Sequence, residues 1–190
     1  YVLSRRNCPF RNFFMGLFVF TMYFSGGLIP TYLVIKWLNM TNTVWVMLVP
    51  FAISTYNLII ARTFIQNNIP ESLVEAATID GCSNIGIYIK IVLPLSKAVM
   101  AVLVVYYGVA QWNSYFTALI YLSDLSKQPL QIILRDILIK NDLNQMVQSA
   151  ESTSSEYVML IEVLKYAVAV VASVPMLILY PFVQKYFVKG

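Results

Sequence analysis

Long apolar stretches alternate with short polar segments along this chain. Four apolar stretches cover residues 12–32, 44–63, 98–122 and 161–186, and most charged residues stand near or outside their ends. A helix of about 20 apolar residues crosses a hydrocarbon core about 30 Å thick. Because lipid offers the backbone no hydrogen-bond partners, we expect each stretch to form a helix. The pattern predicts an all-α fold, a polytopic transmembrane helical bundle with four visible spans.

Helix-breaking residues stand inside three of these spans. Gly26-Gly27 and Pro30 loosen the far end of the first span, and Pro50 lies inside the second. Pro175 and Pro181 are expected to bend the last span, since proline removes a helical hydrogen bond.

Composition excludes several classes of protein. Hydrophobic residues make up 59% of the chain and charged residues 12%, whereas soluble domains carry about 25% charged residues. The net charge of +4 does not indicate nucleic-acid binding, because the basic residues flank apolar stretches and form no single patch. With no histidine, and with cysteine only at Cys8 and Cys82, no zinc or other metal site is expected.

The distribution of lysine and arginine predicts the orientation. If the segment before the first span lies inside, the inner basic residues are Arg5, Arg6, Arg11, Arg62, Lys90, Lys97, Lys185 and Lys189. The outer ones are then fewer: Lys36, Lys127, Arg135, Lys140 and Lys165. The positive-inside rule favours this choice, with both ends of this chain cytoplasmic. The chain begins at Tyr1 and not at methionine, so we expect it to be truncated at the N-terminus.

The polar segment between the second and third spans has residues typical of the start and the end of a short helix. Pro70 suits the first helical turn, and the negative charge of Glu71 favours a helix N-terminus. Gly81 can end the helix in a left-handed conformation. Ser83 can then cap a second short helix, which Pro94 is expected to interrupt.

This first helix offers a surface to a partner. Ala76 and Ala77 are small enough to let another surface approach closely, and Glu75 and Asp80 offer negative charge to a basic partner. An amphipathic loop helix that lies on the membrane fits these residues as well.

The spacing of this segment resembles the EAA loop of bacterial ABC-importer permeases. The matching residues are Glu75, Ala76, Ala77, Asp80, Gly81, Ile91, Leu93 and Pro94. Residues 24–32, 111–114 and 180–190 resemble permeases of the maltose type. Within that group the chain is most similar to permeases for complex polysaccharide fragments and uronic-acid oligosaccharides. The chain departs from the family after Leu93-Pro94, where Lys97-Ala98 stands in place of a frequent second proline.

The resemblance implies the type I ABC importer permease fold with six spans. The EAA loop of that family lies between the fourth and fifth spans, so the four visible spans would be spans three to six. Residues 1–190 would then be a single transmembrane domain without its first two spans. Its cytoplasmic coupling loop would cover about residues 66–97, and an extracytoplasmic loop about residues 123–160.

The resemblance also implies the partners. Two ABC ATPase subunits would bind ATP and Mg, since this chain has no phosphate-binding glycine-rich motif. This chain is therefore expected to be no enzyme and to bind no cofactor. A second related permease would complete a heterodimeric pore in the bacterial cell membrane. An extracytoplasmic binding protein would deliver the sugar. Glu75 would pair with a basic residue of the ATPase, while Ala76, Ala77 and Gly81 would provide close fit and turn geometry.

Polar and aromatic residues inside the spans are candidates for the substrate path, because such groups usually face protein or water. They are Tyr56, Asn57, Gln111, Trp112, Asn113 and Thr117. Hydroxyl and amide groups pair with sugar hydroxyls, and aromatic faces pack on sugar rings. The alternative role is hydrogen bonding and packing between helices.

The outer polar segment, residues 123–157, predicts an interfacial helix. Its apolar residues are Leu130, Ile132, Ile133, Leu134, Ile137, Leu138 and Ile139. Such a helix would pack against the partner permease, meet the binding protein or rest on the bilayer surface.

Other functions remain as alternatives. One is an ABC permease for another class of solute. An ion-coupled transporter would need an ionisable residue inside a span, and the first three spans carry none away from their ends. A membrane enzyme would need a catalytic constellation, and no acidic pair lies inside a span. The fourth alternative is a membrane scaffold, and the spaced EAA pattern argues against it.

Overall fold

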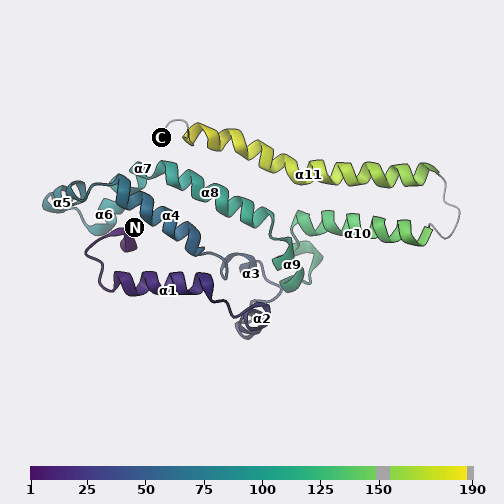
Figure 1. Ribbon diagram of the computed structural model, residues 1–190, viewed down its shortest axis with the longest axis horizontal. Helices are drawn as coiled ribbons and strands as arrows, with labels where there is room; N and C mark the ends of the chain where they lie inside the picture. The colour runs from purple at the N-terminus through teal and green to yellow at the C-terminus, as the bar shows by residue number, and fades with distance from the viewer. Residues whose placement is uncertain (149–154, 188–190) are drawn as a thin grey trace. The chain divides into compact units, whose positions relative to one another are not determined.

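The computed structural model describes the backbone of residues 1–148 and 155–187, and side chains mainly within residues 1–139 and 163–181 (Figure 1). Every regular element in these ranges is helical. The chain divides into two compact units. The first comprises residues 1–34 and 50–107 with the described residues from 183 on, and the second comprises residues 35–49 with the described part of 108–182.

The first unit holds the N-terminal segment and the predicted coupling loop. Its elements are η1 (Val2–Ser4), α1 (Arg11–Tyr23), α4 (Thr55–Asn68), α5 (Glu71–Ile79), α6 (Asn84–Ile87), the π-helical turn η2 (Tyr88–Val92) and α7 (Leu93–Leu95). Within this unit α4 packs against both η1 and α1.

The second unit holds the predicted outer segment. Its elements are α3 (Trp45–Leu48), α9 (Tyr115–Tyr121), η3 (Leu125–Lys127) and α10 (Leu130–Gln148), with α9 in contact with α3 and α10. Three helices have residues in both units: α2 (Leu28–Trp37), α8 (Lys97–Trp112) and α11 (Ser155–Phe187).

The predicted first span is two helices and not one. The axes of α1 and α2 differ by 117°, and residues 24–27 between them are not helical. Gly27 has a φ of +84°, a left-handed conformation that interrupts a right-handed helix and favours glycine. The Thr31 hydroxyl and backbone N–H both bond to the Gly27 carbonyl, which anchors the start of α2.

The predicted second span is also broken. Short α3 is followed by non-helical residues around Pro50, and α4 then begins at Thr55. The Ser54 Oγ atom accepts from the Asn57 N–H and caps α4. The Tyr107 hydroxyl accepts from the Ser54 N–H at 3.1 Å. These polar contacts replace the helical hydrogen bonds that a continuous span would have made.

The predicted third span divides into α8 and α9. Asn113 Nδ2 donates to the Val109 carbonyl at 3.0 Å, and Ser114 Oγ donates to the Gln111 carbonyl at 2.6 Å. These side chains occupy carbonyl groups at the end of α8 and so favour the break. The start of α8 at Lys97 agrees with the predicted boundary, and its axis turns by 82° from that of residues 84–95.

The predicted fourth span is one long helix. α11 continues through both Pro175 and Pro181. Its segment Val163–Pro181 is long and apolar enough to cross a membrane. Among the described residues it is the one single helix that meets this test. The count rises to as many as three candidate spans if each of two bent helix pairs is one span. These pairs are α1 with α2, and residues 84–95 with α8.

By helix length and composition, the described residues give up to three candidate spans, where the apolar pattern predicts four. The difference arises at residues 44–63, because α3 has only 4 residues and α4 carries Asn57, Arg62 and Gln66.

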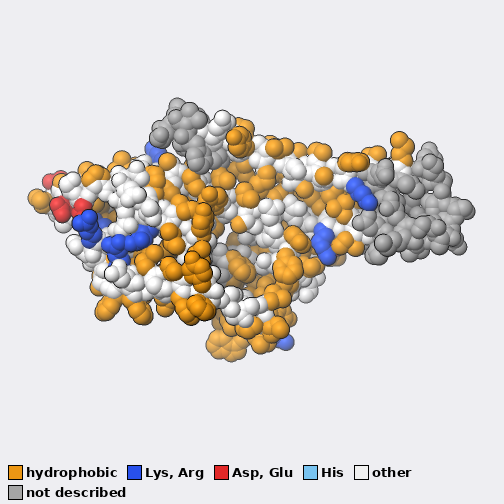
Figure 2. All heavy atoms as spheres, viewed as in Figure 1, with side chains coloured by type: hydrophobic (Ala, Val, Ile, Leu, Met, Phe, Trp, Pro, Cys, Tyr) orange, Lys and Arg blue, Asp and Glu red, His pale blue; other side chains and the backbone are white. Residues whose placement is uncertain are grey.

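Large apolar side chains cover much of the surface visible in Figure 2. No residue of α1 is buried, and only 6% of the apolar window of α11 is buried. Exposed residues include Phe13, Phe20, Tyr166, Leu177 and Tyr180. An apolar surface of this extent suits lipid or another subunit, because in water it would favour aggregation.

Candidate functional site

The helix that carries the EAA residues has well-defined ends. Pro70 lies at the N-cap of α5, one residue before the predicted position, and Glu71 is the first helical residue. At the other end, the Cys82 N–H donates to the Ala77 carbonyl at 2.9 Å and the Gly81 N–H donates to the Thr78 carbonyl at 3.1 Å. This pair of bonds is a Schellman motif. Gly81 has the φ of +78° that the motif requires, as the sequence predicted.

A small apolar core supports α5. It consists of Ile69, Val74, Ala77, Ile87 and Val92, all at most 8% exposed. Four half-buried residues pack against it: Tyr1, Ile65, Cys82 and Ile91. The core fixes α5 against the second short helix, so the loop has a shape of its own.

The two alanines of the EAA pattern have different environments. Ala76 is exposed, whereas Ala77 is 7% exposed and belongs to the core. The expected close approach of a partner therefore involves Ala76, while the small side chain of Ala77 serves packing within the loop.

The outer face of α5 carries the predicted charges. Glu75 and Asp80 are exposed, and neither takes part in an ion pair with another described residue. Exposed apolar residues accompany them, with Ile79 at 86% and Ile85 at 72% exposure. The face thus combines negative charge with apolar area, as an interface with a basic, partly apolar partner requires.

The second short helix follows the prediction at its start only. Ser83 Oγ accepts from the Gly86 N–H at 3.2 Å and caps α6. The helical run then passes through the π-helical turn η2 and through Pro94, and it ends at Leu95 with Ser96 as its C-cap. The prediction that Pro94 interrupts this helix is wrong, because the proline follows a π turn, whose looser hydrogen bonding tolerates the missing N–H.

The remaining residues of the EAA pattern belong to this run. Ile91 and Leu93 are half-buried and Pro94 is exposed. Ile91 packs against the small core, so at least this residue of the pattern serves the fold of the loop.

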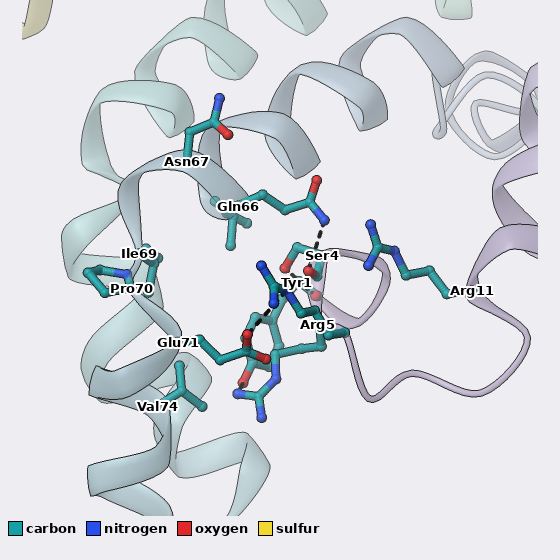
Figure 3. A pocket seen from close by; sticks show the side chains of 12 residues that line it. Tyr1, Ser4, Arg5, Arg11, Gln66, Asn67, Ile69, Pro70, Glu71 and Val74 are labelled. Atoms are coloured by element: carbon teal, nitrogen blue, oxygen red, sulfur yellow. Dashed lines mark hydrogen bonds and ion pairs between the residues drawn. The ribbon is translucent and has the colours of Figure 1, made fainter.

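The N-terminal segment packs against the loop, which the sequence reasoning did not predict. Arg6 Nε lies 3.2 Å from Glu71 Oε2, and Gln66 Nε2 donates to the Ser4 carbonyl at 3.1 Å (Figure 3). Arg62 Nε donates to the Leu3 carbonyl at 3.0 Å. The positive-inside assignment put both segments on one side of the membrane, but no sequence signal indicated which residues meet.

Two of the predicted substrate-path residues lie in the first unit. Tyr56 is 55% exposed, and its ring lies 6.2 Å from that of Tyr106. Asn57 is 7% exposed, in the first turn of α4 next to the Ser54 cap. The structure therefore brings Tyr56 together with an aromatic neighbour at the break of the second predicted span.

The other four, Gln111, Trp112, Asn113 and Thr117, lie in the second unit at the α8–α9 break. Trp112 Nε1 donates to the Ala172 carbonyl of α11 at 3.1 Å. Its N–H thus takes part in hydrogen bonding between helices, which is the alternative to a contact with sugar. Gln111 is exposed and Thr117 half-buried, while the Asn113 amide bonds to its own helix.

Asn42 organises the predicted outer segment of the second unit. Its Oδ1 accepts from the N–H groups of Ser123 and Asp124, its N–H donates to the Tyr121 carbonyl, and its carbonyl accepts from Lys127 Nζ. Hydrogen bonds from Ser126 hold the pKa of Asp124 below its usual range. The sequence reasoning missed Asn42, whose positive φ of 57° has no reliable sequence signal.

The predicted outer helix is present as α10. Ile132 and Leu134 are 1% and 7% exposed, whereas Ile133 is 45% exposed. α10 contacts α9, so part of its apolar surface is buried within the second unit. Part of the predicted extracytoplasmic loop, residues 149–154, lies outside the described residues.

No group of three or more His, Cys, Asp or Glu residues in the described part of the chain could hold a metal ion.

Comparisons with known proteins match nearly the whole chain. The profile of the family described as "Binding-protein-dependent transport system inner membrane component" matches residues 2–190. The polygalacturonan/rhamnogalacturonan transport system permease protein YtcP of Bacillus subtilis (strain 168) is 46% identical over 195 residues, covering 100% of this chain and 65% of that protein. Protein LplC of the same organism is 45% identical over 190 residues, covering 100% of this chain and 63% of LplC.

A solved structure has the same fold. The crystal structure of a bacterial ABC transporter involved in the import of the acidic polysaccharide alginate matches with a TM-score of 0.84 and 29% identity. The match covers 98% of this chain and 65% of that chain. It confirms the predicted fold class. This chain spans just under two thirds of the length of each of these proteins.

Proposed function

Because this chain belongs to the family of binding-protein-dependent transport system inner membrane components, we propose that it is the transmembrane permease subunit of an ATP-dependent ABC importer. Its cargo is a sugar or oligosaccharide. The observation that carries the proposal is the exposed, negatively charged face of α5, which the small core and the Schellman motif hold in a fixed shape.

The coupling loop covers about residues 66–97 on the cytoplasmic side. Its outer face binds one of two ATPase subunits, which carry ATP and Mg. Glu75 pairs with a basic side chain there, and Ala76 allows the surfaces to approach. ATP then shifts the permease toward its outward-open state because the closed ATPase pair binds that state more tightly. This chain hydrolyses nothing itself.

The cargo assignment is supported by the relatives. YtcP is named for polygalacturonan and rhamnogalacturonan transport, and the solved neighbour imports alginate, which is an acidic polysaccharide. We infer that this chain transports oligosaccharides of the acidic, uronic-acid class. An ABC permease for another class of solute is the second candidate, since the curated relatives also include sn-glycerol-3-phosphate permeases.

The other subunits follow from the same proposal. A second related permease completes a heterodimeric pore, and it covers part of the apolar surface of this chain. An extracytoplasmic binding protein delivers the sugar near the outer segment of residues 123–160. Both ends of this chain lie in the cytoplasm of the bacterial cell.

Purification of the full-length protein from native membranes in mild detergent, followed by mass spectrometry, tests the assembly. We expect an ATPase subunit, a second permease and a binding protein to copurify. Recovery of the permease alone would refute the coupling function and favour a scaffold.

Uptake of labelled oligogalacturonides, with neutral maltooligosaccharides as control, tests the cargo. Uptake of the neutral sugars alone would refute the acidic class.

A further inference from the structure

A pocket of about 370 Å³ lies between the N-terminal segment and the beginning of the coupling loop (Figure 3). All of its lining residues belong to the first unit. Three of them are arginines, Arg5, Arg6 and Arg11, and one is acidic, Glu71. The arginine pocket, as we call it, therefore carries a surplus of positive charge.

Only one of the three guanidinium groups has an acidic partner among the described residues. Arg6 pairs with Glu71, and their side chains are 81% and 39% exposed. Arg5 donates from Nη1 to the Tyr1 hydroxyl at 3.1 Å, and its Cζ lies 5.8 Å from the centroid of the Tyr1 ring. Neither contact brings a negative charge to Arg5. Arg11 Nε is buried and has no hydrogen-bond partner in the described part of the chain.

An anion in the pocket would resolve this imbalance. A buried donor without a partner costs about 1–3 kcal/mol, more when it is charged. The planar guanidinium group matches the geometry of phosphate oxygens and binds them in a bidentate manner. Figure 3 shows Arg11 extending from the start of α1 toward the side of the pocket where Ser4 and Gln66 lie.

The surroundings of the pocket favour a lipid over a soluble phosphate. Arg11 is both a lining residue and the first residue of α1, whose next turns expose Phe13 at 65%, Phe14 at 46% and Leu17 at 50%. A phosphate bound at Arg11 would thus lie beside an apolar helix surface on which acyl chains can pack. Basic pockets at the cytoplasmic ends of membrane helices suit anionic headgroups.

We propose that the arginine pocket binds the phosphodiester group of an anionic phospholipid. Arg5 and Arg11 contact the phosphate, and Arg6 stays on Glu71. The bound lipid joins the N-terminal segment to the first turn of α5 and thereby holds the coupling loop at the membrane surface. The proposal requires α1 to lie in the membrane and does not depend on the cargo.

Native mass spectrometry of the purified importer tests the proposal. The complex is placed in nanodiscs of phosphatidylcholine with phosphatidylglycerol or cardiolipin, and the lipids that survive release are identified. Wild type is expected to retain an anionic lipid. Arg11→Gln is expected to weaken this binding roughly 10-fold or more, since a charge-assisted hydrogen bond is lost.

The matched control is Arg135→Gln, the same change at an arginine of α10 outside the pocket. It is expected to retain the lipid as wild type does. Equal loss in both variants would show nonspecific attraction to arginine and would overturn the proposal. If Arg11→Gln fails to fold, Arg5→Gln replaces it, with the same expected loss.

A second arm separates the two sources of phosphate. Inorganic phosphate is added to the importer in nanodiscs of phosphatidylcholine alone, and the thermal midpoint is measured. We expect no Arg11-dependent rise from phosphate and a clear rise from phosphatidylglycerol. A rise of equal size from inorganic phosphate would overturn the lipid assignment. Sugar uptake is measured separately, so failure here leaves the transport proposal intact.

Discussion

Gly81 sets the end of α5 through its backbone conformation. Its φ of +78° suits glycine, and a Cβ there would meet nothing within 4 Å. The cost of any other residue at this position is therefore conformational and not steric. The Schellman bonds at Ala77 and Thr78 depend on this conformation.

We predict that Gly81→Ala destabilises the coupling loop by about 1 kcal/mol, because a side chain disfavours positive φ. Hydrogen exchange of residues 71–82 should quicken, and transport per ATP should fall. Gly16→Ala is the control, since Gly16 also has open space but no positive φ. Equal exchange rates in wild type and Gly81→Ala would contradict this prediction.

Glu75 is the residue at which we expect the interaction with the ATPase to be most sensitive to charge. It is exposed and has no ion-pair partner among the described residues, so its carboxylate is available to another chain. Glu71, in the same helix, is already paired with Arg6.

Glu75→Lys should reduce sugar-stimulated ATPase activity about 10-fold or more, because it places like charges together at an interface. Membrane insertion should be unchanged. Glu75→Gln, which removes the negative charge without reversing it, should reduce the activity less than Glu75→Lys does. Normal sugar-stimulated activity in Glu75→Lys would refute the assigned role of the loop.

At the scale of elements, the ends of α8 and α4 are the places where polar side chains replace helical hydrogen bonds. Asn113 and Ser114 bond to carbonyls at the end of α8, and Ser54 caps α4. Trp112 joins α8 to α11 through its indole N–H. The predicted substrate-path residues lie beside these breaks, where side chains already bond to the backbone groups that the helices leave.

Trp112→Phe should lower the thermal midpoint without changing the KM for sugar. The change removes one hydrogen bond, worth about 1 kcal/mol, and keeps an aromatic face for the sugar ring. Trp37→Phe is the control, since Trp37 is 81% exposed. A raised KM with an unchanged midpoint would show that the indole N–H contacts the sugar and not Ala172.

For the whole molecule, the two native cysteines report the orientation. Cys8 and Cys82 are both free and half-buried, and both lie in segments assigned to the cytoplasm. Lys127, in η3, is exposed and assigned to the outside.

A membrane-impermeant maleimide should label neither native cysteine in intact spheroplasts, and should label them after permeabilisation. Lys127→Cys should be labelled without permeabilisation. The opposite pattern would invert the topology and place α5 on the wrong side for an ATPase.

Local sequence signals were sufficient to predict the helical class, the membrane setting and the extent of the coupling helix. Apolar runs and the residues that start and end helices act within a few positions of one another, so the roles of Gly81 and Ser83 follow from the sequence alone. The charges of Glu75 and Asp80 are equally plain in the sequence, and the structure shows both side chains exposed.

The breaks in the spans and the contacts between distant segments depend on the tertiary structure. The α8–α9 junction interrupts an apolar run that reads as continuous, because side-chain hydrogen bonds there compete with the helix. At Gly27 the sequence predicts a loosened end, and the structure has a complete break at a positive φ. The burial of Ala77 and the pairing of Arg6 with Glu71 arise from packing between segments far apart in sequence. Such contacts depend on the path of the whole chain, so residue spacing within one helix does not predict them.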